Sequence, residues 1–246
     1  IDVFVASKKV GPTGKAIGID MTPEMLSQAL VAAGQVARNL GYRNTEFHHG
    51  FLEEIPVDSE TADLVTSNCV VNLSTDKPKV FQEIARVLKH GGRFVISDIV
   101  AKTPVPEELQ KDKELWGECL SGALTEVELL KAAESAGFYG LEIMKRSFYK
   151  ALPDYDFYAV TVQGWKFKKG PECVYIGQMA TYGGPYAEVT DDDGHVYKRG
   201  VPFEVCTDTA AKLKLPPYAG QFTVDDPAIK ITAPKTCCSS ESGGCC

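Results

Sequence analysis

The chain has 246 residues, of which 44% are hydrophobic, so its composition is sufficient for a core domain with a smaller partner. Its net charge of −7 and its scattered lysines and arginines argue against nucleic acid or an anionic membrane as a partner. No apolar run approaches the ~20 residues that span a bilayer, and residues 1–20 lack the pattern of a signal peptide. We therefore expect a cytoplasmic protein with a small-molecule ligand.

Helix and strand patterns alternate as far as residue 137. Thr22 and Pro23 are typical of a helix start, and Gly41 of a helix end. The spacing Thr125–Glu128 predicts a capping box at the start of a later helix that Gly137 ends. The predicted elements are a helix at 2–9, a strand at 15–20, a helix at 23–40, strands at 46–48 and 62–66, a helix at 75–91, a strand at 93–99, a helix at 125–137, and strands at 140–149 and 156–167.

This alternation predicts an α/β fold with a doubly wound, mostly parallel sheet and helices on both faces. The last two strands have no helix between them, which indicates a hairpin at one edge of the sheet. A doubly wound fold normally begins with a strand and a glycine-rich turn, whereas this sequence begins with a helix. We therefore expect that an N-terminal segment is missing, and that the first domain, residues 1–168, is incomplete.

Beyond residue 168 glycine, proline and tyrosine become frequent and helical periodicity weakens. We predict a small, loop-rich second domain at 169–233. The segment 234–246 has the composition of a flexible tail and carries two cysteine pairs, Cys237-Cys238 and Cys245-Cys246. The tail thiols either capture and deliver a metalloid, exchange with a thiol reductant, or are incidental.

Asp20 and Met21 follow the strand at 15–20. In nucleoside-binding α/β folds, a carboxylate at the end of that strand accepts the ribose hydroxyls, and the ligand lies across the strand ends. The alternative is a helix-capping or surface aspartate. In the turn Gly50-Phe51-Leu52-Glu53, Leu52 is a candidate to pack on an adenine face and Glu53 to accept its exocyclic amine. The alternative there is an ordinary amphipathic turn.

Two single cysteines follow later strands. Cys69, preceded by Asn68, comes directly after the strand at 62–66, at the rim where the reactive end of a cofactor would lie. Cys119 lies in the connection after the strand at 93–99, which can fold over the same rim. We include Asn68 among the candidate cofactor-binding residues. Reduced thiols are soft ligands suited to soft metals or metalloids, although a buried structural cysteine is the common alternative.

The segments GIDMT, GFLE, SNCVVNLS, DKPKVFQEIARVLKHGGRFVISDIV and LWGECLSGAL occur in this order and together resemble the arsenite S-adenosylmethionine methyltransferases. The resemblance runs from residue 1 to about residue 206. Ubiquinone-type methyltransferases share the strand–acid and Lys-Gly-Gly patterns, whereas the two cysteine-bearing segments are specific to the arsenic family. A Rossmann-like class I methyltransferase fold is thereby implied.

The resemblance also implies site residues and partners. Cys69 and Cys119 correspond to the arsenic-binding thiols of the family, and Asp20 to its ribose-binding acid. The implied cofactor is S-adenosylmethionine. The implied partners are arsenite, methylated arsenicals and a thiol reductant of the glutathione or thioredoxin type. The glycine-rich loop and the N-terminal cysteines of the family would lie before residue 1, so no third thiol ligand is assigned.

Two alternatives to an arsenite methyltransferase remain open at this point. One is a methyltransferase for a small organic acceptor, with structural cysteines; the other is a thiol-rich arsenic-binding protein without activity. We expect Cys173 and Cys206 to be structural. We also expect that backbone N–H groups near the end of its strand favour ionisation of Cys69.

Overall fold

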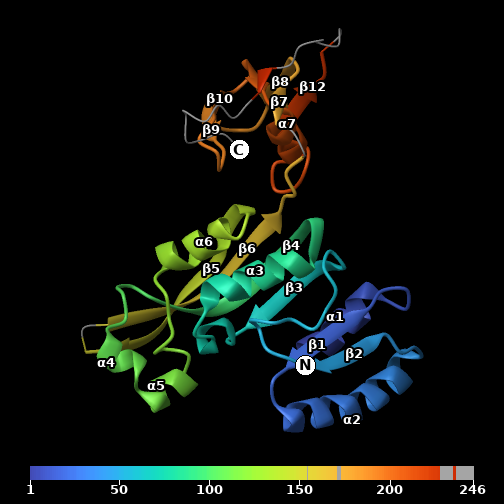
Figure 1. Ribbon diagram of the computed structural model, residues 1–246, viewed down its shortest axis with the longest axis vertical. Helices are drawn as coiled ribbons and strands as arrows, with labels where there is room; N and C mark the ends of the chain where they lie inside the picture. The colour runs from blue at the N-terminus through green and yellow to red at the C-terminus, as the bar shows by residue number, and fades with distance from the viewer. Residues whose placement is uncertain (154, 171–172, 228–234, 237–246) are drawn as a thin grey trace.

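The four-stranded sheet β3-β4-β6-β5 forms the centre of the first region, residues 2–166 (Figure 1). The computed structural model describes residues 1–153, 155–170, 173–227 and 235–236. Strand β3 (Ala62–Asn68) runs parallel to β4 (Leu88–Ala101), and β6 (Tyr155–Lys166) is antiparallel to both β4 and β5 (Phe138–Leu152). The expected edge hairpin is therefore the pair β5–β6.

Helices α3 (Lys77–Val87) and α6 (Glu126–Ser135) cover one face of this sheet (Figure 1). Their apolar sides meet the sheet in the main hydrophobic cluster, which includes Phe81 and Ile84 from α3, Leu129 from α6, and Phe94 from β4. The capping box at α6 is confirmed, because Thr125 accepts a bond from the Glu128 backbone and the Glu128 carboxylate accepts one from the Thr125 backbone.

The prediction that the α3 helix extends from 75 to 91 is wrong at both ends. Asp76 caps the helix through a bond from Lys79, and the helix ends at Val87. Leu88, which is fully buried, already belongs to β4 and pairs with Ala62. The Lys-His-Gly-Gly segment at 89–92 forms an irregularity in the β3–β4 pairing, and Gly91 supplies the left-handed φ of 75° that this turn needs.

Strands β1 (Ala16–Asp20) and β2 (Thr45–His49) form a separate parallel pair. Helices α1 (Asp2–Val10) and α2 (Pro23–Leu40) lie beside this pair (Figure 1). Ile19 on β1 packs against the main cluster, but β1 forms no ladder with β3 in the described chain. The expected doubly wound α/β arrangement is thus present, with its sheet in two pieces.

Three short helical segments follow β3 and β4 in the chain. They are the 3₁₀ turn η1 (Val71–Leu73) after β3, and α4 (Glu107–Gln110) and α5 (Lys113–Gly117) after β4. Leu120 and Ile99 belong to a second apolar cluster, where this segment packs on β4. None of the described helices is long and apolar enough to cross a membrane.

The C-terminal region has a core of its own, built around Tyr182, Tyr197 and Leu213. Strand β8 (Gln178–Tyr182) lies between β11 (Pro202–Val205) and β12 (Phe222–Asp225). The remaining elements are two strand pairs and one helix, namely β9 (Glu188–Thr190) with β10 (Val196–Lys198), β7 (Val174–Tyr175) with β13 (Lys235–Thr236), and α7 (Thr207–Leu213). The expected tail at 234–246 and its cysteines lie outside the described residues, apart from the backbone of β13.

Candidate functional site

The two singled-out cysteines share an unusual backbone conformation. Cys69 directly follows β3 with a φ of 55°, and Cys119 lies two positions after the end of α5 with a φ of 62°. Backbone bonds hold both, from Cys69 N to the Ser97 carbonyl at 2.8 Å and from Cys119 N to the Trp116 carbonyl at 3.0 Å. A left-handed conformation costs a side-chain-bearing residue about 1–2 kcal/mol and is concentrated at functional sites.

The fold brings these cysteines together across fifty positions of sequence. The Cys119 thiol donates to the Cys69 carbonyl oxygen, with 3.2 Å between Sγ and O. Cys69 is exposed, whereas Cys119 is 7% exposed and forms part of the apolar cluster around Leu120. The segments that carry these two cysteines are therefore in contact, through the Cys119 thiol and the Cys69 backbone.

Two buried polar residues that sequence reasoning did not single out connect the cysteine loops. Asn72 on η1 donates to the Ile99 carbonyl at 2.7 Å and to the Cys119 carbonyl at 3.0 Å. Asp98 on β4 accepts from the Ile99 and Asn72 backbones at 2.8 and 3.2 Å. The available signal was a polar residue inside an otherwise apolar strand, since Asp98 interrupts the run RFVISDIV.

The electrostatic environment opposes ionisation of the thiols. Burial, together with Asp98 and the nearby Cys69, raises the pKa of Cys119 to about 11. Burial and Asp98 likewise raise the pKa of Cys69. The expectation that the fold favours a Cys69 thiolate is therefore wrong, because burial, with Asp98 as a second cause, raises the pKa of this thiol.

A cavity of about 200 Å³ opens beside Cys69. Its wall includes Asn68, Asp98 and three hydroxyl-bearing residues from the sheet, Ser97, Ser147 and Thr161. A larger hollow of about 860 Å³ lies between the turn after β2 and α3, and no cysteine lines it. Of these two cavities, only the smaller has one of the two candidate cysteines, Cys69, in its lining.

The candidate ribose acid, Asp20, stands at the end of β1. Its Oδ1 accepts from the backbone and hydroxyl of Thr22 at 2.8 and 2.6 Å, which fixes the carboxylate at the start of α2. In the described chain Oδ2 has no partner, so Asp20 can both hold the turn and accept from a ligand. Met21, beside it, is 52% exposed, and the ring of His49 lies between the Met21 carbonyl and the ring of Phe51.

The two candidates in the Gly50–Glu53 turn have different surroundings. Leu52 is half-buried against the main core, whereas Phe51 is 53% exposed. Glu53 accepts from the Ser74 hydroxyl, just before α3. Phe51 is therefore the more accessible apolar face in this turn, and Glu53 links it to the segment that carries Cys69 and Asn72.

The other described cysteines lie away from this site. Cys206 caps α7, where its sulfur accepts from the Thr209 backbone at 3.4 Å, as a structural role requires. Cys173 is half-buried next to β7 and carries no candidate role in the site.

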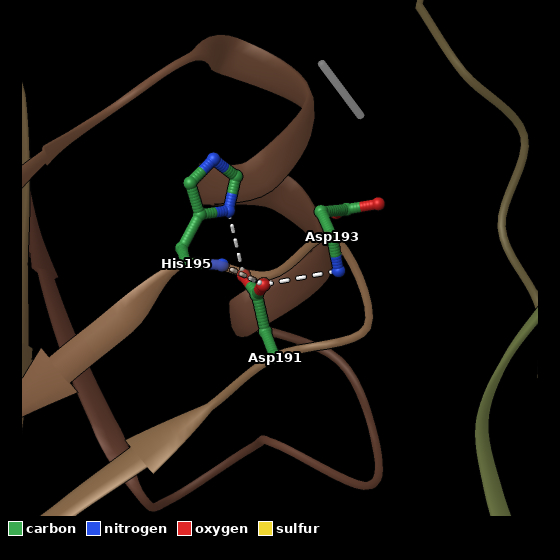
Figure 2. Close-up of side chains that lie close together, drawn as sticks. All are labelled: Asp191, Asp193 and His195. Atoms are coloured by element: carbon green, nitrogen blue, oxygen red, sulfur yellow. Dashed lines mark hydrogen bonds and ion pairs between the residues drawn. The ribbon is translucent and has the colours of Figure 1, made fainter. Parts of the chain in front are cut away.

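A second polar cluster lies in the C-terminal region, where ligand atoms of Asp191, Asp193 and His195 fall within 4.8 Å of one another (Figure 2). Asp191 is already fully engaged. It accepts from the Asp193 and His195 backbones at 3.0 and 2.8 Å, and from the His195 ring and the Tyr197 hydroxyl at 2.9 Å each. The bond to Asp191 raises the pKa of His195, and the bonds from His195 and Tyr197 lower that of Asp191 against the opposing effect of burial.

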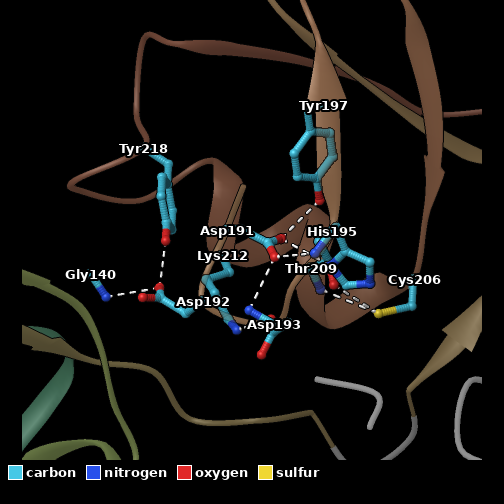
Figure 3. Close-up of polar contacts among 10 residues, drawn as sticks. All are labelled: Gly140, Asp191, Asp192, Asp193, His195, Tyr197, Cys206, Thr209, Lys212 and Tyr218. Carbon is cyan, nitrogen blue, oxygen red and sulfur yellow. Dashed lines mark hydrogen bonds and ion pairs between the residues drawn. The ribbon is translucent and has the colours of Figure 1, made fainter. Parts of the chain in front are cut away.

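This cluster fastens the second region to the first (Figure 3). Asp193 pairs with Lys212 of α7, and Asp192 accepts both from Tyr218 and from the Gly140 backbone on β5, the latter at 2.9 Å. The turn from Asp191 to His195 is thus a structural junction whose polar groups are satisfied within the chain.

Comparison with known proteins places the chain in a family. A profile described as a methyltransferase domain matches residues 2–145, and a domain of unknown function matches residues 169–244. The human arsenite methyltransferase is 34% identical over 262 residues, covering 99% of this chain and 67% of the human protein. The rat arsenite methyltransferase is 31% identical over 283 residues, covering all of this chain and 76% of the rat protein.

Among solved structures, the arsenic(III) S-adenosylmethionine methyltransferase of Chlamydomonas reinhardtii superposes with a TM-score of 0.66 at 31% identity, covering 94% of this chain and 83% of the algal one. The chain spans about two thirds of the human and mouse relatives, 67% and 66%, and 35% of the one from Halobacterium salinarum. By the matched profile and these relatives, the chain belongs to the arsenite methyltransferase family, on a class I methyltransferase domain.

Proposed function

We propose that this chain takes part in the methylation of trivalent arsenic by S-adenosylmethionine, with Cys69 and Cys119 as the arsenic-binding thiols. The observation that carries the proposal is the contact of these cysteines, fifty residues apart, through the bond from Cys119 Sγ to the Cys69 carbonyl. Both residues have a left-handed backbone conformation. Relatives named as arsenite methyltransferases support the choice of arsenic as substrate.

Binding by these thiols does not require them to be ionised beforehand. Each thiol replaces a hydroxyl group of arsenite: an S–As bond forms, an As–OH bond breaks, and the thiol proton leaves with the hydroxyl as water. The raised pKa values of Cys69 and Cys119 are compatible with this exchange because the proton has an acceptor in the leaving group. Arsenic so held keeps its lone pair, which is the nucleophile.

The residues around Asp20 fit the adenosine part of S-adenosylmethionine. Oδ2 of Asp20, which has no partner among the residues that the structure describes, is suited to ribose hydroxyls. The exposed Met21 and Phe51 offer apolar faces, and Glu53 offers a carboxylate. The cofactor, when bound, supplies an electrophilic methyl group on a sulfonium. The protein's own contribution is to hold and orient the arsenic, which is worth several kcal/mol when two reactants are aligned. No general base is needed, since the arsenic carries no proton.

The thiols must be free to bind arsenic, and disulfides are rare in a reducing cytosol. We therefore propose a cytoplasmic setting, with a thiol reductant of the glutathione or thioredoxin type that keeps Cys69 and Cys119 reduced. Arsenite and methylated arsenicals are the remaining partners.

The test is the pair Cys69→Ser and Cys119→Ser in the full-length gene product, assayed with arsenite, S-adenosylmethionine and a thiol reductant. A hydroxyl is a hard ligand and does not replace a soft thiolate, so each variant should lose most methylation while it keeps its fold. Cys173→Ser, a thiol outside the site, is the matched control. Methylation by both variants at the parent rate would show that the cysteines are structural, as a methyltransferase for an organic acceptor would require.

A further inference from the structure

We propose that Asn72 is a positioning residue that sets the separation of the two arsenic-binding thiols. The inference rests on the proposed function and adds to it a residue that touches neither arsenic nor cofactor. Asn72 is 3% exposed and lies on η1, three positions after Cys69. Its side chain reaches across to the other cysteine, which is fifty positions from Cys69.

The hydrogen bonds of Asn72 admit only an amide at this position. Both partners of its Nδ2 are carbonyl oxygens, that of Ile99 on β4 at 2.7 Å and that of Cys119 at 3.0 Å. Two acceptors require one group with two N–H donors, which the asparagine amide provides and a carboxylate or aliphatic side chain does not. The Cys119 backbone is thereby fastened to β4, the strand that also receives the Cys69 N–H at Ser97.

The backbone of Asn72 is held as firmly as its side chain. Its N–H donates to the buried Asp98 at 3.2 Å. On the other side, Gly122 packs so closely that a Cβ there would lie 2.0 Å from the Asn72 carbonyl oxygen. The Cys119 segment can therefore approach η1 only because residue 122 has no side chain, and the two loops touch at three points: the Asn72 amide, the Cys119 thiol and Gly122.

This contact matters for arsenic because chelation by two thiols depends on their spacing. A second thiol already in place binds intramolecularly, and that advantage falls when the geometry is no longer fixed. Loosening the Cys119 loop should leave each thiol intact and accessible while it weakens binding of any arsenical that needs both. A residue with a merely structural role would not separate these two properties.

The experiment uses the full chain with the four tail cysteines, Cys237, Cys238, Cys245 and Cys246, changed to serine, so that the tail does not bind the probe. The probe is phenylarsine oxide, a trivalent arsenical that binds two thiols, titrated by calorimetry. Asn72→Ala and Gly122→Ala should each raise its Kd about tenfold or more, since each removes or displaces the bonds that hold the Cys119 loop. The alkylation rate of the exposed Cys69 by iodoacetamide should stay within about twofold of the parent.

Two controls accompany these variants. Gly117→Ala adds the same methyl group in the same segment, where a Cβ meets nothing within 4 Å, and should leave the Kd unchanged. Leu129→Ala removes a core side chain on α6 and should lower the melting temperature without changing the Kd. If Asn72→Ala does not fold, Gly122→Ala decides the question.

Wild-type affinity in both Asn72→Ala and Gly122→Ala would overturn the positioning role and leave the proposed function standing. Failure of the parent chain to bind the probe, or binding unaffected by Cys69→Ser, would instead overturn the proposed function. A weaker affinity in Leu129→Ala equal to that in Asn72→Ala would assign the effect to lost stability and also overturn the proposal.

Discussion

The buried Cys119 thiol should make the protein less stable in alkaline solution. Burial, together with Asp98 and Cys69, raises the pKa of this thiol from its ordinary value of 9.0 to about 11. The folded state therefore retains the thiol proton more strongly than the unfolded chain does. Stability is unaffected below the unfolded pKa and falls as the pH rises from about 9 towards 11.

Between pH 8 and pH 10, this single group should lower the free energy of unfolding by about 1.3 kcal/mol. The assay is urea denaturation of the parent and of Cys119→Ser at both pH values. Serine does not titrate there, so the stability difference between the two proteins should change by that amount, while the tyrosines and lysines, common to both, cancel. Equal losses in the two proteins would refute the claim that the Cys119 site excludes the thiolate.

Three further outcomes are expected. Asp20→Ala should weaken binding of S-adenosylhomocysteine to the full-length gene product by ~1.5–3 kcal/mol, which is the typical value of a hydrogen bond to a charged group. An unchanged affinity, measured by calorimetry, would show that Asp20 does not bind the cofactor. Arsenite binding at pH 7.5 should be accompanied by almost no exchange of protons with the buffer, because each thiol proton leaves with a hydroxyl group of arsenite as water. Calorimetry in two buffers of different ionisation enthalpy measures this, and uptake of a proton per thiol, which thiols ionised beforehand would cause, would contradict it. The Asp191–His195 pair should stabilise the protein most between pH 3.8 and 6.5. This contribution is lost as the pH falls through the lowered pKa of Asp191 or rises through the raised pKa of His195. The stability difference between the parent and Asp191→Asn should therefore shrink from pH 5.5 to pH 8.5, and a constant difference would argue against the pair.

Local signals in the sequence were sufficient for the elements that carry their own caps and periodicity. The capping box at Thr125 and the glycine after α2 act within a few residues, so they can be recognised without the fold. The end of α3 could not be placed, because Leu88 continues the helical spacing and only its pairing with Ala62 makes it a strand residue. Helix α7 is too short for periodicity to show and is stabilised by its packing against β8.

The candidate site divides in the same way. Cys69 and Cys119 were found because their motifs resemble those of a known family, and the fold brings them together. Asn72 and Asp98 act through contacts with residues 26 to 47 positions away, which no local pattern reports. The pKa of Cys69 was predicted in the wrong direction for the same reason, since the burial of its thiol and the position of Asp98 both depend on the folded structure.

The left-handed backbone at Cys69 has a consequence for how variation at this position would be detected. Glycine adopts that conformation without strain, and the exposed side chain of Cys69 contributes little packing. A Cys69→Gly chain should therefore fold, accumulate and melt like the parent while it has lost one of the two thiols proposed to bind arsenic. Surveys that score variants by cellular abundance would class it as harmless, and only an arsenic-challenge phenotype would reveal the defect.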